Sequence, residues 1–255
     1  MKKFLLSTVA IIAIASSASA ADVSGEVTLD FAETASSNWA GTFGLELDVV
    51  ATETSAVTLG FTATPGGDLN LDTWTVGTAL GGVELSFGND NSVFVEAEGE
   101  QTIAAPAMTE SLKIALAGAS FAVGFTDWTA DITDVSNVQG AYTLDMGYVS
   151  TTVSGDYNMD NEDFVVGAAV SGVNLGALGL GTVVTYDNAS SDIGYEVIAT
   201  VDSFTAYVNG NDTDAFQNLG AEYVRALGGV NLTSAVVYNI DAEEFTPTIG
   251  LAFAF

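Results

Sequence analysis

The sequence predicts an antiparallel β-barrel of about sixteen strands that crosses a membrane. Apolar residues fall at every second position over most of the chain, and the connections between these alternating segments are long and short in turn. Beyond the N-terminal segment, no run reaches the length of about 18 consecutive apolar residues that a spanning helix needs. A barrel explains all three observations, because its outside meets lipid, its inside meets water and its two rims differ in loop length. The alternative count is about fourteen strands, since segment boundaries are harder to place than segments.

The chain begins with a predicted secretory signal peptide. Two lysines precede an apolar run that extends from Phe4 to Ala15, and small residues follow up to Ala20. A basic start, an apolar run of about a dozen residues and a small-x-small end are typical of such a signal, with cleavage after Ala20. The run is too short to cross a membrane as a helix. We therefore expect export, removal of residues 1–20, and a barrel formed by residues 21–255.

The composition excludes several classes of function. The chain contains 33 acidic and four basic residues, with no cysteine and no histidine. It can therefore form neither disulfides, zinc–thiolate sites nor histidine-dependent catalytic triads. Loss of Lys2 and Lys3 with the signal peptide would change the net charge from −29 to −31. Such a surface repels phosphates, so we expect no nucleic-acid partner. No enzyme is expected either; acid–base chemistry by a carboxylate cluster is the one enzymatic alternative.

The alternating segments follow one another along the whole expected barrel. The first places Val23, Val27 and Phe31 on one face and polar side chains on the other. Gly81-Gly82 and Asp202-Ser203 are two-residue hairpin signals, whereas longer polar stretches mark the opposite rim. The expected strands cover residues 23–31, 43–49, 57–61, 74–80, 83–87, 112–116, 121–125, 138–144, 149–157, 164–170, 178–186, 193–201, 204–208, 219–223, 230–238 and 245–255.

Aromatic residues gather at the ends of these segments, on the apolar face. On this assignment Phe61, Trp74, Phe164 and Tyr186 lie at the long-loop end of their strands. Rings at such positions form the interfacial girdles of membrane proteins, between hydrocarbon and headgroups. The ordinary core of a soluble β-protein does not predict that aromatics cluster at one rim. The pattern therefore favours a barrel surrounded by lipid.

The C-terminal strand gives the most specific signal. From Phe245 to Phe255, every odd position is apolar and every even position is small or weakly polar. The edge strand of a soluble sheet is the alternative from this segment alone. A terminal strand of this kind resembles the sorting signal of bacterial outer-membrane β-barrel proteins, which the barrel assembly machinery recognises and which closes the barrel against the first strand. The residues that would form this signal are Ile249, Leu251, Phe253 and Phe255.

Signal peptide, strand number and terminal phenylalanine together resemble the general bacterial porins. In that family the loop after the fifth strand folds into the barrel and narrows the pore, and the matching segment here is the long gap at residues 88–109. The resemblance implies an outer-membrane homotrimer with a loop-bearing constriction. It departs from the family in one respect, because residues 21–255 contain a single arginine and cannot form the ladder of arginines that usually faces this loop. The expected constriction residues are Asp90, Glu96, Glu98, Glu100 and Glu110.

Carboxylates on the non-apolar face predict the kind of solute. A carboxylate that faced lipid would cost several kcal/mol, so we expect these side chains to line a water-filled lumen. An acidic lumen attracts cations and repels anions. The hypothesis is passive diffusion of small hydrophilic solutes with a preference for cations. The expected lumen-wall residues are Glu26, Asp30, Glu46, Asp48, Glu84, Lys113, Glu196 and Glu222.

Other interpretations of the acidity remain open. External loops could bind Ca²⁺ through carboxylate and carbonyl oxygens, although they lack the ordered spacing of an EF-hand. The negative charge could also serve solubility in a saline habitat. A closed structural or adhesive barrel whose loops bind a partner is the main functional alternative, and a soluble ligand-binding β-sandwich is the third class. The possible calcium ligands are Asp160, Glu162, Asp163, Asp212 and Asp214.

Overall fold

The computed structural model describes residues 22–33, 39–52, 55–63, 70–89, 91–95, 108, 110–126 and 134–254. The predicted signal peptide, Phe255 and four of the five expected constriction residues (Asp90, Glu96, Glu98 and Glu100) lie outside the described residues. Within the described ranges every regular element is a β-strand. No helix in this part of the chain is long and apolar enough to cross a membrane.

The residues that the structure describes form sixteen strands, as the alternating pattern predicted. They are β1 (Asp22–Glu33), β2 (Trp39–Thr52), β3 (Ser55–Ala63), β4 (Asn70–Leu80), β5 (Val83–Gly88), β6 (Glu110–Leu116), β7 (Ala119–Phe125), β8 (Val135–Asp145), β9 (Ser150–Asn158), β10 (Phe164–Leu175), β11 (Leu178–Asp187), β12 (Asp192–Val201), β13 (Phe204–Asn211), β14 (Asn218–Ala226), β15 (Val230–Asn239) and β16 (Glu244–Ala254).

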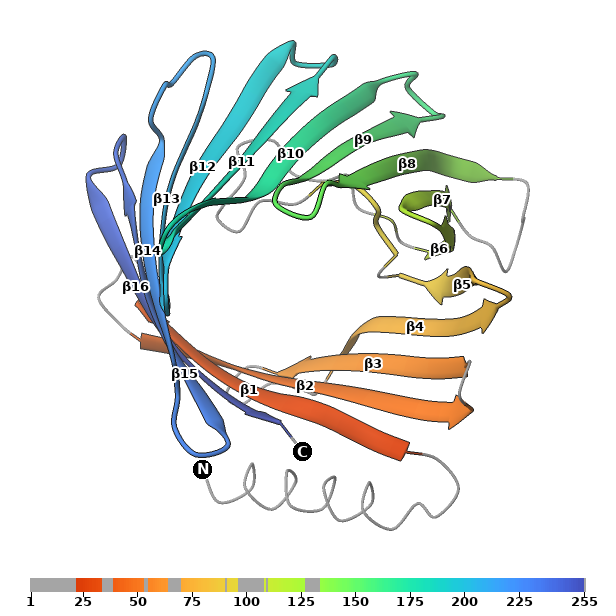
Figure 1. The fold of residues 1–255 in the computed structure, drawn as a ribbon, viewed down its shortest axis with the longest axis horizontal. Coiled ribbons are helices and arrows are strands. Elements are labelled where there is room, and N and C mark those ends of the chain that lie inside the picture. Colours follow the sequence, from red (N-terminus) through yellow and green to blue (C-terminus); the bar gives the residue numbers. More distant parts are fainter. Residues whose placement is uncertain are drawn as a thin grey trace.

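The strands make one closed antiparallel barrel. Each strand pairs with its neighbours in the chain, and β16 closes the barrel against β1, with Leu29 opposite Leu251 and Val27 opposite Phe253. Figure 1 shows the strands as a ring, with the chain that leaves β5 following the inner side of the wall toward β10. Closure removes the unpaired edges that an open sheet would expose. The predicted up-and-down barrel is confirmed.

Alternate side chains separate into two faces. Val166, Val184 and Val197 belong to one face and are 43, 43 and 44% exposed. Neighbouring positions of opposite parity carry buried polar side chains, among them Gln139 and Glu196. The first set is the outer face, where aliphatic exposure suits lipid, and the second is the inner face.

Aromatic side chains pair across strands on the outer face. The rings of Trp74 and Phe87 have their centroids 5.3 Å apart and meet edge to face. Phe164 and Tyr186 lie 6.2 Å apart, between β10 and β11. Such pairs stabilise adjacent strands beyond the area they bury.

Short turns join the strands at one rim and longer loops join them at the other. Gly81-Gly82 and Gly228-Gly229 each have two successive positive φ angles, as two-residue hairpins with the twist of a β-sheet require. At Gly229, φ is 94°, a conformation that a β-branched residue does not tolerate.

Replacement of Gly229 by valine is expected to lower the free energy of unfolding by about 1–3 kcal/mol, because the turn must distort or the side chain must accept a strained backbone. Urea unfolding of the protein in lipid vesicles would measure the change. Gly140→Ala is a suitable control, since a Cβ there meets nothing within 4 Å and φ is not positive. Equal stability of the Gly229→Val protein and the wild type would contradict the prediction.

Candidate functional site

Residues 91–95, here called the anchor segment, lie against the inner face of the barrel. Asn91 fixes the beginning of this segment beside β5 and β6. Its side chain accepts a hydrogen bond of 2.6 Å from Ser86 Oγ, and its Nδ2 donates to the carbonyl oxygen of Ser111 at 3.1 Å. Asn91 is 3% exposed and Ser111 is fully buried. The chain therefore turns inward directly after β5.

Two polar side chains of β8 and β9 hold the middle of the anchor segment. The Oε1 atom of Gln139 accepts hydrogen bonds from Ser92 Oγ at 3.0 Å and from the backbone N–H of Val93 at 2.9 Å. One strand further, Ser154 Oγ accepts from the backbone N–H of Val95 at 3.0 Å. Gln139 has no exposed surface. Side chains of the barrel wall thus accept the hydrogen bonds of the Val93 and Val95 N–H groups, which a neighbouring strand would accept in a sheet.

The end of the anchor segment packs against β10 and β11. Phe94 and Val95 form a buried cluster with Val183, and Val165 and Ala169 pack against it. Gly167 leaves the space that the cluster needs: a Cβ at this position would lie 2.5 Å from Val95 Cγ2 and 3.0 Å from Phe94 Cζ. The anchor segment is therefore held against the inner wall by close packing as well as by hydrogen bonds.

Carboxylates gather on the inner face of the first strands. Glu26 on β1 lies directly opposite Glu46 on β2, and both line a concave region of about 270 Å³ together with Asp72 of β4. Asp48 accepts a hydrogen bond of 2.6 Å from Thr58 Oγ1. Asp30 Oδ1 lies 2.6 Å from the place that a Cβ of Gly250 would occupy, so the glycine leaves room for this carboxylate. Like charges opposite each other disfavour pairing, which makes these positions costly for the fold.

The other expected wall residues lie apart from this cluster. Glu84 on β5 is exposed, and Lys113 on β6 lies opposite Ser86 of β5. Glu196 on β12 is 1% exposed and lies between Val183 and Asn209 on the neighbouring strands. Glu222 on β14 lies opposite Thr205. The other basic residue in the part of the chain that the structure describes, Arg225, shares the parity of outward-facing Tyr223.

Glu110 lies on a strand and not in the loop with which its position in the sequence grouped it. It is the first residue of β6 and pairs with Phe125, whereas Lys113 lies opposite Ser86, whose side chain donates to Asn91 of the anchor segment on the inner face. Strand alternation therefore puts Glu110 on the outer face, with Leu112. We do not include it in the proposed constriction.

Three asparagines form a hydrogen-bonded ladder across β13, β14 and β15. Asn218 Nδ2 donates to Asn209 Oδ1 at 3.1 Å, and Asn239 Nδ2 donates to Asn218 Oδ1 at 3.0 Å. Asn209 has no exposed surface and Asn218 is 6% exposed. The ladder is uncharged, in contrast to the acidic face of β1–β4.

Replacement of Asn218 by alanine is expected to lower the free energy of unfolding by about 1–3 kcal/mol, because the buried amide of Asn209 and the half-buried amide of Asn239 would each lose a partner. The urea midpoint in lipid vesicles would report the loss. Asn231→Ala changes an exposed side chain on β15 and serves as the control. The ladder would have no stabilising role if both variants unfolded at the wild-type midpoint.

Asparagine side chains organise the acidic outer loops. Asn158 Oδ1 accepts a hydrogen bond from the backbone N–H of Asp160 at 2.9 Å, and Asn211 Oδ1 accepts from that of Asp214 at 2.6 Å. Within the described ranges, no three carboxylates come together in a group that could hold a metal ion. Calcium binding by Asp160, Glu162, Asp163, Asp212 or Asp214 stays a prediction.

Several inner-wall residues were not predicted from the sequence. Asp72 was missed because β4 begins at Asn70 and a register shift follows Gly60, so simple alternation from Trp74 does not reach it. Gln139 and Asp156 share the parity of the polar face, and this signal would have found them. Asn137 donates to Asp156 at 2.9 Å, and both are 4% exposed.

Comparison with known proteins identifies the fold. No protein-family model and no curated protein matches the sequence. A mutant of the Rh. blastica porin matches the structure with a TM-score of 0.65 at 16% sequence identity, covering 92% of this chain and 100% of that one. For Salmonella typhi OmpF in complex with daunomycin the TM-score is 0.61 at 9% identity, with 92% and 97% covered. For an anion-selective porin from Comamonas acidovorans it is 0.57 at 12%, with 92% and 99% covered. The chain therefore has the fold of the bacterial porins, and the resemblance stated from the sequence is confirmed at the level of fold.

Proposed function

We propose that the protein is a bacterial outer-membrane porin through which small hydrophilic solutes diffuse passively, with a preference for cations. The observation that carries the proposal is the closed barrel of sixteen strands with carboxylates on its inner face. Aliphatic and aromatic side chains on the outer face suit contact with lipid. The predicted signal peptide and the C-terminal strand, read by the barrel assembly machinery, would bring the chain to that membrane.

The distribution of charge supports the preference for cations. The inner face of β1–β4 carries Glu26, Asp30, Glu46, Asp48 and Asp72. Of the two basic residues that the structure describes, only Lys113 has inner-face parity. Carboxylates in a narrow, low-dielectric passage raise the local concentration of cations. Selectivity belongs to these side chains rather than to the fold, since a neighbour with the same fold is described as anion-selective.

The anchor segment supports a constriction within the barrel. It carries the chain from β5 along the inner wall as far as β10 and β11, and the residues that follow it in the sequence include Glu96, Glu98 and Glu100. With Asp90, these carboxylates would add to the negative charge at the narrowest part of the pore. A homotrimer is part of the proposal, because OmpT of Vibrio cholerae, one of the fold neighbours, is described in a trimer form.

Planar-bilayer recording of the purified protein would test the proposal. We expect stepwise conductance increases and, in a tenfold KCl gradient, a reversal potential of the sign set by K⁺ permeation. Salt dependence provides a further check, because raising the ionic strength from 0.01 to 1 M shortens the Debye length from about 30 to 3 Å and should reduce the selectivity. Stable insertion without conductance would exclude the channel and favour a structural or adhesive barrel with acidic loops. An anion-selective reversal potential would exclude the preference for cations but not the channel itself.

A further inference from the structure

The inner wall contains a niche of about 500 Å³ beside the anchor segment, at the turn end of β10–β12. Gly179 and Gly181 of β11 form part of its floor. A Cβ at Gly181 would make no contact shorter than 3.4 Å, the distance to the Val170 carbonyl oxygen. The register of β10 with β11 also shifts between Val170 and Val173, so the wall departs from regular pairing here. The niche is thus a cavity in the wall of a size typical of small-molecule sites.

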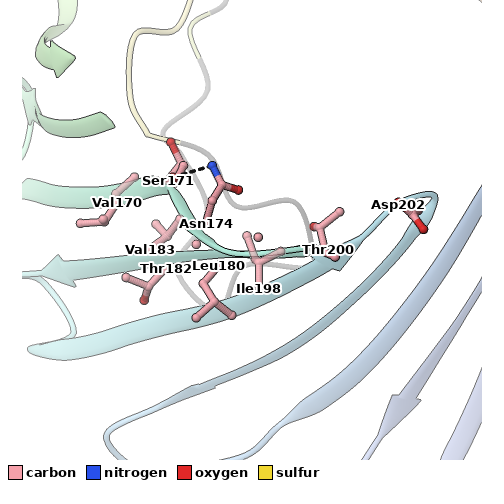
Figure 2. A pocket seen from close by; sticks show the side chains of 14 residues that line it. Val170, Ser171, Asn174, Leu180, Thr182, Val183, Ile198, Thr200 and Asp202 are labelled. Carbon is pink, nitrogen blue, oxygen red and sulfur yellow. Dashed lines mark hydrogen bonds between the residues drawn. The ribbon is translucent and has the colours of Figure 1, made fainter. Parts of the chain in front are cut away.

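The niche combines an apolar floor with hydrogen-bond acceptors. Ala169, Val183 and Ile198 contribute aliphatic surface. Val183 also belongs to the buried cluster with Phe94 and Val95, and Ala169 packs against that cluster. Asn174 uses its Nδ2 to donate to the Gly172 carbonyl oxygen at 3.0 Å, which leaves Oδ1 available on the side of Gly179, 3.7 Å from the place of its Cβ. In Figure 2 Thr200 lies between Asn174 and Asp202, whose carboxylate belongs to the β12–β13 turn.

The charge of the lining restricts the ligand further. Among the described residues that line the niche, one is acidic, Asp202, and none is basic. Acceptors without neighbouring cationic donors favour a ligand that brings its own donors, such as an ammonium group with three N–H bonds. The aliphatic floor favours a ligand with an apolar body, since burial of each methylene group contributes to affinity. An anion would meet the acidic inner face before it reached this wall.

We infer that this niche binds small organic cations with an apolar body, such as alkylammonium ions. The inference rests on the proposed channel only for the route by which a cation reaches the niche. A bound cation would lie next to the anchor segment, where it would obstruct the current of smaller ions. The niche would therefore distinguish amphipathic cations, which are retained, from hydrophilic cations of the same charge, which pass.

Channel block by two matched amines would test the inference. Hexylammonium and protonated 2-(2-aminoethoxy)ethanol have the same number of non-hydrogen atoms and the same charge, but only the first has an apolar body. We expect hexylammonium to halve the single-channel current at a concentration about tenfold lower than the ether amine does. A ratio near one in the wild type would overturn the inference.

Substitutions within and outside the niche provide the controls. Gly181→Leu fills the niche and is expected to bring the ratio of blocking concentrations close to one. Gly77→Leu adds the same side chain to the inner wall of β4, where a Cβ meets only the Leu85 carbonyl oxygen at 3.6 Å, and should leave the ratio unchanged. Asp202→Asn is expected to weaken block by both amines severalfold. An unchanged ratio in Gly181→Leu would overturn the assignment of the site.

A binding measurement separates this inference from the proposed function. Saturation-transfer NMR on the barrel in deuterated detergent detects bound hexylammonium whether or not the barrel conducts. We expect transfer to its methylene protons in the wild type and in Gly77→Leu, and its loss in Gly181→Leu. Binding without conductance would exclude the channel and keep the niche. Conductance without any transfer in the wild type would keep the channel and exclude the niche.

Discussion

Replacement of Gly167 by leucine is expected to lift the anchor segment from the inner wall while the barrel stays closed. The Cβ alone would lie 2.5 Å from Val95 Cγ2 and 3.0 Å from Phe94 Cζ, and neither side chain has free space behind it, since Val95 is 6% and Phe94 4% exposed. Such overpacking costs about 1–3 kcal/mol, comparable to the contribution of the three hydrogen bonds from the anchor segment to Gln139 and Ser154. The displaced segment should make the open-channel current noisy, with additional conductance levels.

Thiol labelling would measure the displacement directly. The chain has no cysteine, so Val95→Cys introduces a single reporter. In the otherwise native protein this thiol should react slowly with a maleimide, and Gly167→Leu should increase the labelling rate by at least about tenfold, because the reaction follows the population of the open form. Gly77→Leu is the matched control on the opposite part of the wall. If labelling stayed slow and the current stayed quiet in Gly167→Leu, Gly167 would not be needed to seat the segment.

Removal of four inner-face carboxylates is expected to abolish most of the cation preference. A fully cation-selective pore in a tenfold salt gradient gives a reversal potential of about 59 mV. The combined variant Glu26→Gln, Asp30→Asn, Glu46→Gln and Asp48→Asn should move the potential at least halfway toward zero, since the amides keep the shape of the wall but not its charge. Low salt, from about 0.01 to 0.1 M, is the best condition because screening is then weakest.

A charge-conserving variant distinguishes electrostatics from altered shape. Glu26→Asp, Asp30→Glu, Glu46→Asp and Asp48→Glu change the length of every side chain but no charge, so the wild-type reversal potential should persist. If the neutral variant kept the wild-type potential as well, the selectivity would originate elsewhere, and Glu96, Glu98 and Glu100 would be the next residues to neutralise. Single-channel conductance in the same experiment would show whether the passage had changed in size.

The barrel could be predicted from the sequence because its determinants are local. Alternation of apolar and polar residues, two-residue turns such as Gly81-Gly82 and the pattern of the last strand are each visible within about ten residues. Closure then follows, because an open sheet of this length would leave two unpaired edges. Faces were assigned by the same alternation, and it places Glu26 and Glu46 opposite each other.

The details of the inner wall depend on contacts that a local pattern does not contain. The seat of the anchor segment joins residues far apart in the chain, such as Val95 with Gly167 and Ser92 with Gln139. The register shift after Gly60 brings Asp72 to the inner face, and nothing in the alternation marks this shift. Glu110 was grouped with the loop by proximity in the sequence, although it already belongs to β6.

The contacts that hold the anchor segment also determine when it can dock during folding. Its hydrogen bonds to Gln139 and Ser154 join residues 46, 47 and 59 positions apart, and its apolar cluster needs β11 as well. These partners lie side by side only after β8–β11 have paired, so the anchor segment can dock only late in folding. A chain arrested before β11 would keep Phe94 and Val95 exposed. The anchor segment is therefore fixed in place only after the wall from β8 to β11 has formed.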